Sequence, residues 1–197
     1  PVLVDLPLDV SASSWDGDIP KEVDIRGYKP NTVGHPRQIK AAADAINSAE
    51  RPVIYAGGGV IIAGASAELR EMAAKGNIPV TLTLLGLGAV AGDDPRFLGM
   101  LGMHGTATAN YAIQESDLII AVGARFDDRI TGKIEAFAPH AKIVHIDIDP
   151  TSISKNIKVD IPVVGDARGI LAEINKLLEA KERKSWLDRV EMWRSKH

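Results

Sequence analysis

The sequence predicts an α/β fold in which helices cover both faces of a parallel sheet. Short apolar runs alternate with segments of helical periodicity along most of the chain. The run from Leu118 to Val122 is wholly apolar, as in a strand that is buried on both faces. Glycines directly follow several of these runs, as in the turns that lead from a parallel strand into the next helix.

Each expected element rests on a local pattern. The strands are short apolar runs at 52–56, 79–84, 118–122, 142–148 and 161–164. Helices are expected at 36–48, 66–75, 106–115, 132–137 and 167–182. We expect a further helix in the polar tail 185–197, whose Trp186, Val190 and Trp193 would dock on something absent from this chain.

The first 33 residues are expected to lie outside the α/β domain. Residues 1–10 are predicted to be the last strand of an upstream element, ended by Pro7. Residues 11–33 are rich in Pro, Gly, Asp, Ser and Lys without helical periodicity, which predicts an extended linker. The chain starts at Pro1 without a Met, which indicates a fragment of a longer protein.

Composition narrows the class of protein. The chain has 197 residues, 45% hydrophobic and 25% charged, enough for a buried core. A net charge of −3 without a basic run argues against nucleic acid and acidic membrane surfaces as partners. The chain has no cysteine, so disulfides and thiolate metal sites are excluded. Since no signal peptide or long apolar span is visible, we expect a cytoplasmic, bacterial protein.

The segment 100–129 has features of a site for a phosphate-bearing cofactor. Thr106 can cap a helix whose first N–H groups would face an anion. Gly123 ends the next strand, and ligands of open α/β sheets bind beyond the carboxyl ends of strands. Arg125 could then form a bidentate contact with pyrophosphate, and Arg129 could hold a carboxylate substrate. The alternative is a solvated loop with weak ion pairs.

Two glycine-containing turns are candidates for backbone contact with a ligand. Gly57, Gly58 and Gly59 follow a strand and can let the backbone approach a ligand closely, or can simply form a tight turn. The dinucleotide pattern G-x-G-x-x-G fails because its third glycine would fall at Ile62. The segment 84–88 exposes leucines beside bare backbone, which suits a flat ring, although it could also fold back on the core.

Acidic residues end two later strands. Asp147 and Asp166 are expected at neighbouring strand ends, where carboxylates can bind the two hydroxyls of a ribose. His145, Asp147 and Asp149 share one strand face, yet no fourth ligand is apparent and no metal site is predicted. His104 lies at a helix start, where a neutral imidazole could donate to a ligand or be merely structural. No nucleophile triad, catalytic carboxylate pair or Walker loop is visible, so we predict no catalytic residue here.

The motifs together resemble a known family. They are RPVIYAGGGV (51–60), PVTLTLLGLGA (79–89), GMLGMHG (99–105), ARFDDR (124–129) and AKIVHIDIDP (141–150). In this order they resemble the central domain of the catalytic subunit of acetohydroxyacid synthase, also called acetolactate synthase. The opening PVLVDLPLDV resembles the end of that family's pyrimidine-binding domain.

The resemblance implies a fold and a division of the chain. The fold would be three-layer α/β/α with a mostly parallel six-stranded sheet, the DHS-like, Rossmann-like type of thiamine diphosphate enzymes. Residues 1–33 would be the end of the pyrimidine-binding domain plus a linker, 34–182 the central FAD-binding domain and 183–197 a C-terminal linker.

The resemblance also implies an activity for the whole enzyme. This transferase condenses pyruvate with pyruvate or 2-oxobutanoate, with decarboxylation, in branched-chain amino-acid biosynthesis. Thiamine diphosphate and Mg²⁺ would be held by the flanking domains, whereas FAD would bind the central domain without a redox role. The partners would be a second catalytic subunit and a small regulatory subunit.

The family's site residues can be placed on this chain by position. Cofactor-binding residues would be Gly57, Gly58, Gly59, Thr83, Leu84, Leu85, His104, Gly105, Gly123, Ala124, Arg125, Asp147, Ile148, Asp149, Asp166 and Ala167. Substrate-channel residues would be Met103, Asp128 and Arg129. The activating glutamate would lie upstream of Pro1 and the GDG-type motif beyond His197, so we predict that this fragment alone is inactive.

Two other interpretations stay open. One is the central domain of a related thiamine diphosphate enzyme such as pyruvate oxidase, in which flavin carries electrons. The other is a NAD-binding Rossmann domain, against which Ile62 and the missing hydride-handling site count.

Overall fold

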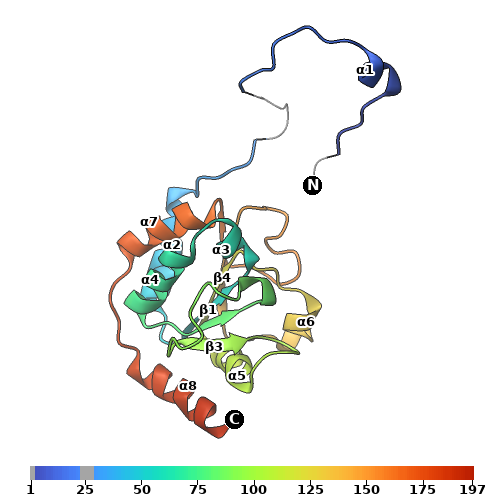
Figure 1. The fold of residues 1–197 in the computed structure, drawn as a ribbon. Helices are drawn as coiled ribbons and strands as arrows, with labels where there is room; N and C mark the ends of the chain where they lie inside the picture. Colours follow the sequence, from blue (N-terminus) through green and yellow to red (C-terminus); the bar gives the residue numbers. More distant parts are fainter. Residues whose placement is uncertain (1–2, 23–28) are drawn as a thin grey trace.

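A single six-stranded sheet forms the centre of the molecule (Figure 1). The computed structural model describes residues 3–22 and 29–197. All strand pairs are parallel, in the order β3-β2-β1-β4-β5-β6. The strands are β1 (Pro52–Ala56), β2 (Val80–Leu82), β3 (Phe97–Met100), β4 (Leu118–Val122), β5 (Lys142–Asp147) and β6 (Ile161–Val164).

The strand order reverses in the middle of the sheet. The chain moves from β1 outward to β3, returns to pair β4 with β1, and then moves the other way to β6. Such a reversal is a topological switch point, where the connections leave the sheet on opposite sides and open a crevice beyond the strand ends.

Helices cover both faces of the sheet, as predicted. On one face α7 (Ala167–Leu177) packs against α2 (Pro36–Ser48) and α4 (Ser66–Gly76). On the other face α5 (Ala107–Glu115) packs against α8 (Lys184–Lys196). The short elements are α1 (Leu8–Ala12), α3 (Gly58–Ile62), α6 (Asp128–Thr131) and the 3₁₀ turns Leu84–Gly86 and Ile134–Ala136.

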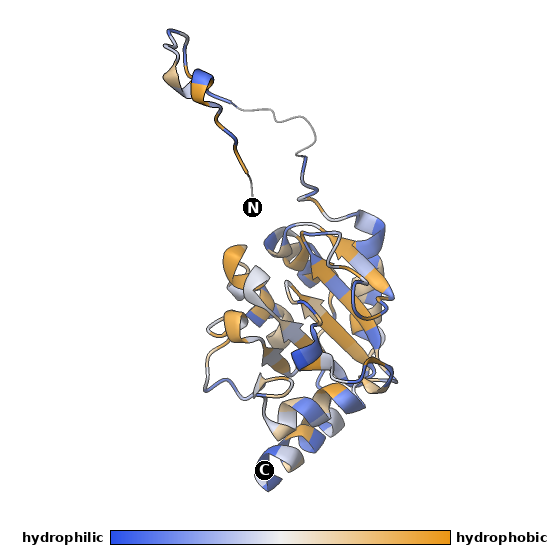
Figure 2. Ribbon diagram, turned by 90° about the vertical axis from the view of Figure 1, so that its right-hand side faces the viewer, coloured by the Kyte–Doolittle hydropathy of each residue, from blue (hydrophilic) through white to orange (hydrophobic). Residues whose placement is uncertain are grey.

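Strands β1 and β4 consist mostly of apolar residues and are buried along their whole length. Much of the sheet is accordingly coloured as hydrophobic in Figure 2. In β1, Ile54 belongs to the apolar cluster under α2, α4 and α7, whereas Val53 and Tyr55 belong to the cluster under α5 and α8. Alternate side chains of one strand thus pack into the hydrophobic cores on opposite faces of the sheet, which confirms the three-layer α/β/α prediction.

Several predicted bounds differ from the observed ones. The strand expected at 79–84 ends at Leu82, because Thr83 accepts the Gly86 N–H through its side chain and begins a 3₁₀ turn. Strand β3 was not among the runs read from the sequence, since Gly99 with φ +89° interrupts a run of only four residues. The helix expected at 132–137 is instead α6, which ends before Gly132, followed by a 3₁₀ turn.

The expectation that the C-terminal helix docks on something absent is wrong. Trp186, Val190 and Trp193 of α8 are buried in this domain. The Trp186 indole donates to the backbone oxygen of Pro52 at the start of β1 (3.0 Å). Helix α7 ends at Leu177 instead of 182, so an irregular segment leads into α8.

The strand predicted at the start of the chain is also not observed. Pro1 and Val2 lie outside the described residues, residues 3–7 have no regular structure, and α1 has no buried residue. In the described ranges no helix is long and apolar enough to cross a membrane.

Candidate functional site

A cavity of about 780 Å³ opens at the carboxyl ends of the strands. This volume lies within the range of roughly 300–1,000 Å³ that is typical of small-molecule sites. Of the predicted cofactor-binding residues, these line it: Gly57, Gly58, Gly59, Thr83, Leu84, Leu85, His104, Gly123, Ala124, Arg125, Asp147, Ile148, Asp166 and Ala167. The turns after β1, β2, β4, β5 and β6 therefore contribute to one site.

The turns after β1 and β4 pack directly on each other at the switch point. Gly57 N–H donates to Val122 O (2.9 Å) and Gly59 N–H donates to Gly123 O (3.0 Å). A Cβ on Gly57 would lie 2.3 Å from Gly123 O, and one on Gly59 2.6 Å from Gly123 Cα. The close contact between the two turns is enough to require glycine at positions 57, 59 and 123. The backbone of these glycines also forms part of the cavity wall.

The expectation that the helix start at Thr106 faces the ligand is not met. Thr106 Oγ1 accepts the Ala109 N–H (3.1 Å) and donates to Leu98 O (2.5 Å). Among the described residues that line the cavity, none belongs to α5. The helix starts that do reach it are those of α3 and α7, at Gly58 and Ala167.

Asp147 and Asp166 reach the same cavity from neighbouring strand ends, as the sequence predicted. Asp147 Oδ1 accepts the Asp149 N–H (2.9 Å). Asp166 caps α7, with Oδ1 accepting from Arg168 N–H (3.0 Å) and Gly169 N–H (3.3 Å). Gly165 N–H donates to Asp147 O (3.0 Å) and so ties the two strand ends together.

Two predicted cofactor residues, Asp149 and Gly105, lie outside the cavity lining. The Asp149 carboxylate instead stabilises its own turn, since it accepts from Thr151 Oγ1 (2.8 Å), Thr151 N (2.9 Å) and Ser152 Oγ (3.2 Å). These hydrogen bonds, those of Thr151 first, lower the pKa of Asp149. Gly105 serves a tight turn, where a Cβ would lie 2.4 Å from Met100 O.

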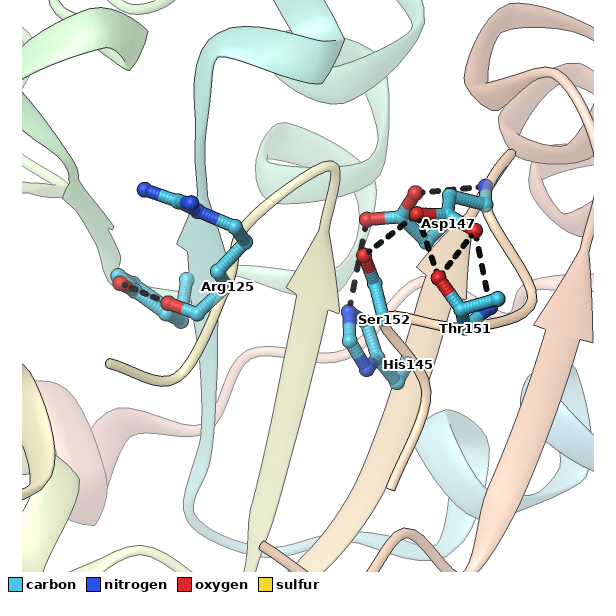
Figure 3. Close-up of polar contacts among 7 residues, drawn as sticks. Arg125, His145, Asp147, Thr151 and Ser152 are labelled. Carbon is cyan, nitrogen blue, oxygen red and sulfur yellow. Dashed lines mark hydrogen bonds and ion pairs between the residues drawn. The ribbon is translucent and has the colours of Figure 1, made fainter. Parts of the chain in front are cut away.

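Arg125 lines the cavity with a positively charged side chain, and its backbone is held by a hydrogen bond from the core. Its exposed guanidinium lies 3.8 Å from the Asp127 carboxylate. Its backbone oxygen accepts a hydrogen bond from the Tyr55 hydroxyl (3.1 Å; Figure 3). Burial, and then the nearby Asp127 charge, raise the pKa of Tyr55, so this hydroxyl stays a donor at neutral pH.

The predicted substrate-channel residues Met103, Asp128 and Arg129 lie where the turn before α5 contacts the start of α6. Met103 N–H donates to Arg129 O (3.0 Å), and the Arg129 guanidinium lies 4.0 Å from the Met103 sulfur. Arg129 lines the cavity, whereas Met103 and Asp128 do not.

Apolar side chains form another part of the wall. Leu84 and Leu85 are 70% and 77% exposed although they lie in the middle of an ordered turn. Ile62 is 90% exposed and also lines the cavity. Exposed aliphatic side chains beside a cavity are typical of a surface that an apolar ligand face covers.

Sequence reasoning did not assign a site role to several lining residues. They are Tyr55, Ile62, Ala63, Met100, Leu101, Asp127, Ile130, Ile146 and Ser152. Two of them could have been noticed in the sequence: Tyr55 has the only hydroxyl in an apolar strand, and Asp127 lies among the charged residues Arg125, Asp128 and Arg129 that follow β4. Within the described ranges no three His, Asp or Glu side chains converge to hold a metal ion.

The fold and cavity define a doubly wound α/β domain with a cavity at its switch point. Residues 39–174 match the family "Thiamine pyrophosphate enzyme, central domain", and the chain belongs to this family. The resemblance that the motifs indicated is thereby confirmed.

Curated relatives agree with this family. The chain is 55% identical to a probable acetolactate synthase large subunit of Methanocaldococcus jannaschii, over 96% of this chain and 33% of the relative. It is 46% identical to the acetolactate synthase large subunit of Haemophilus influenzae and 44% identical to the isozyme 3 large subunit of Escherichia coli. Each of these two alignments covers 100% of this chain and 36% of the relative. The chain thus spans about a third of the length of these relatives.

Proposed function

We propose that this chain is the FAD-binding central domain of an acetolactate synthase large subunit. The observation that supports this most is the meeting of Asp147, Asp166 and Arg125 at one cavity. A cation suits the pyrophosphate, and carboxylates at strand ends suit ribose hydroxyls. FAD bound here would supply no electrons to the condensation and would act as part of the structure.

The residues that line the cavity include groups suited to different parts of FAD. The backbone of Gly58 and Gly123 lines the cavity, and glycine backbone can lie close to a diphosphate. The exposed Leu84 and Leu85 offer an apolar surface to a flat ring. The cavity has room for a small ligand, and its wall is more apolar than charged, as in most cofactor sites.

A titration of the chain with FAD tests the proposal. Flavin fluorescence and the visible absorbance bands report binding, and NAD serves as the competitor. We expect saturable FAD binding that NAD does not displace. Absence of FAD binding, or equal binding of NAD, would contradict the proposed function.

Matched variants assign the binding to the cavity. Asp147→Asn and Asp166→Asn keep side-chain size, and Asn at 166 remains a good helix cap. We expect each to weaken FAD binding about tenfold, or about 1.4 kcal/mol. Asp149→Asn, at the same strand end but outside the cavity lining, should bind like the parent.

For the whole protein we propose the condensation of two 2-oxo acids with decarboxylation. Thiamine diphosphate and Mg²⁺ would be held by the domains on either side, and a small regulatory subunit would be a partner. The relatives named as large subunits support the proposal. Because the chain spans about a third of them, it should form no acetolactate from pyruvate by itself, even with both cofactors added. Acetolactate production by the chain would refute this.

A further inference from the structure

His145 is a buried histidine to which no structural or binding role has been assigned above. It lies in β5 with no exposed surface, and neither ring nitrogen has a hydrogen-bond partner among the residues that the structure describes. Its neighbours in register are apolar, Ala121 on β4 and Pro162 on β6. The Phe126 ring meets it edge-on at 5.5 Å. A polar ring in such surroundings needs a partner.

The nearest charged group is the carboxylate of Asp147. His145 Nε2 lies 3.7 Å from Asp147 Oδ2 (Figure 3). The two residues share one face of β5, since they are two positions apart. A shortening of roughly 0.8 Å would make this contact an ordinary N–H···O hydrogen bond.

The other oxygen of Asp147 is already held. Oδ1 accepts the Asp149 N–H (2.9 Å), so the carboxylate lies between a backbone donor on one side and the imidazole on the other. An ionised carboxylate can accept about four hydrogen bonds, so both oxygens keep capacity for further donors. The side chain is 13% exposed, and it lines the cavity.

We infer that His145 is a positioning residue for Asp147. By donating from Nε2 to Oδ2, the imidazole fixes the plane of the carboxylate, whose remaining lone pairs then accept both hydroxyls of a ribose. Fixing the side chain before the ligand arrives lowers the entropy cost of binding. The inference rests on the proposed FAD site, for which it names the group that orients the diol acceptor.

Variants of His145 separate positioning from packing. His145→Phe fills similar space without a donor, whereas His145→Gln retains an N–H donor. We expect His145→Phe to bind FAD about tenfold more weakly and His145→Gln to stay within about threefold of the parent. Circular dichroism melting identifies any variant that has lost its fold. FAD binding by folded His145→Phe as tight as the parent's would overturn the inference.

A double-mutant cycle tests whether His145 acts through Asp147. If it does, His145→Phe combined with Asp147→Asn should bind FAD no more weakly than Asp147→Asn alone. FMN, which lacks the adenosine ribose, should bind His145→Phe as it binds the parent. Losses that multiply in the double variant would overturn the inference, and so would an equal loss with FMN.

A measurement without flavin distinguishes this inference from the proposed function. In protein with ¹⁵N-labelled histidine, Asp147→Asn should shift the ring nitrogens of His145, while Asp149→Asn should not. If the parent chain binds no FAD, the proposed function fails, and the His145–Asp147 contact is judged by this spectrum alone. Ring nitrogens of His145 that stay unchanged in Asp147→Asn would overturn it.

Discussion

The Tyr55 hydroxyl donates a hydrogen bond of 3.1 Å to the backbone oxygen of Arg125. Tyr55 lies in β1 and Arg125 follows β4, so the bond crosses the switch point of the sheet. The Tyr55 ring also contacts the Phe126 ring, with centroids 5.4 Å apart. A residue of the core thus fixes the segment that presents the Arg125 guanidinium to the cavity.

Removing this hydroxyl should loosen the Arg125 segment without disturbing the core. We expect Tyr55→Phe to lower the free energy of unfolding by about 1 kcal/mol, since the ring contacts remain and one hydrogen bond is lost. Tyr111→Phe, at a half-exposed ring, should change it by less than about 0.5 kcal/mol. Urea unfolding measures both, and equal stability of Tyr55→Phe and the parent would contradict the role of the bond.

The packing of the two glycine turns predicts a large difference between glycines. Gly57→Ala should destabilise the protein by about 2–3 kcal/mol, because its Cβ would meet Gly123 O at 2.3 Å. Gly92→Ala is the matched control, since nothing lies within 4 Å of its Cβ position, and it should cost less than about 0.5 kcal/mol. Thermal unfolding compares the two, and similar melting temperatures would contradict this account of the turns.

Arg183 joins the ends of two helices to the start of α8. Its buried guanidinium donates to the backbone oxygens of Ile46 (2.6 Å), Ala49 (3.2 Å) and Gly76. Arg183→Met should lower the free energy of unfolding by about 3 kcal/mol, because these carbonyls then lack a donor. Lys184→Met, at an exposed ion pair, should cost less than about 0.5 kcal/mol. Equal effects of the two variants in urea unfolding would contradict this.

The Asp94–Arg96 pair predicts part of the acid sensitivity. Arg96 donates from Nε (2.9 Å) and Nη2 (2.8 Å) to the Asp94 carboxylate, and these side-chain bonds lower the pKa of Asp94 in the folded state. Its stabilisation is therefore full above the unfolded pKa of about 3.9 and is lost as the pH falls through the lower folded value.

Asp94→Asn should remove that dependence. We expect it to cost about 1 kcal/mol at pH 7 and less at pH 3, which lies below the unfolded pKa of about 3.9, so that the parent has lost part of the same contribution. Urea unfolding at the two pH values measures the difference. A cost that is the same at both would show that ionisation of Asp94 does not stabilise the fold.

Most of the layer structure could be predicted from local patterns. Strands β1, β4 and β6 and helix α2 have the predicted bounds, because each apolar run or helical face is uninterrupted. Thr106 was expected to cap a helix and does so. The short β3 gave no such signal, since Gly99 breaks its pattern and pairing with β2 alone makes it a strand.

The sequence predicts those site residues that directly follow a strand. It does not predict contacts that form only when distant segments pack together. Asp147 and Asp166 reach one cavity because their strands are neighbours and parallel. The local sequence could not show that the Asp149 carboxylate accepts hydrogen bonds from Thr151 and Ser152. Nor could it show that α8 covers its own domain, because the burial of Trp186 and Trp193 depends on where the chain returns.

The most direct test of the account is a crystal structure of the chain with FAD. We expect the diphosphate beside Gly58 and Gly123, in the turns that follow β1 and β4, and the hydroxyls of the adenosine ribose within hydrogen-bond distance of Asp147 or Asp166. A flavin bound elsewhere, or a cavity filled by the protein's own side chains while FAD is present in excess, would contradict it.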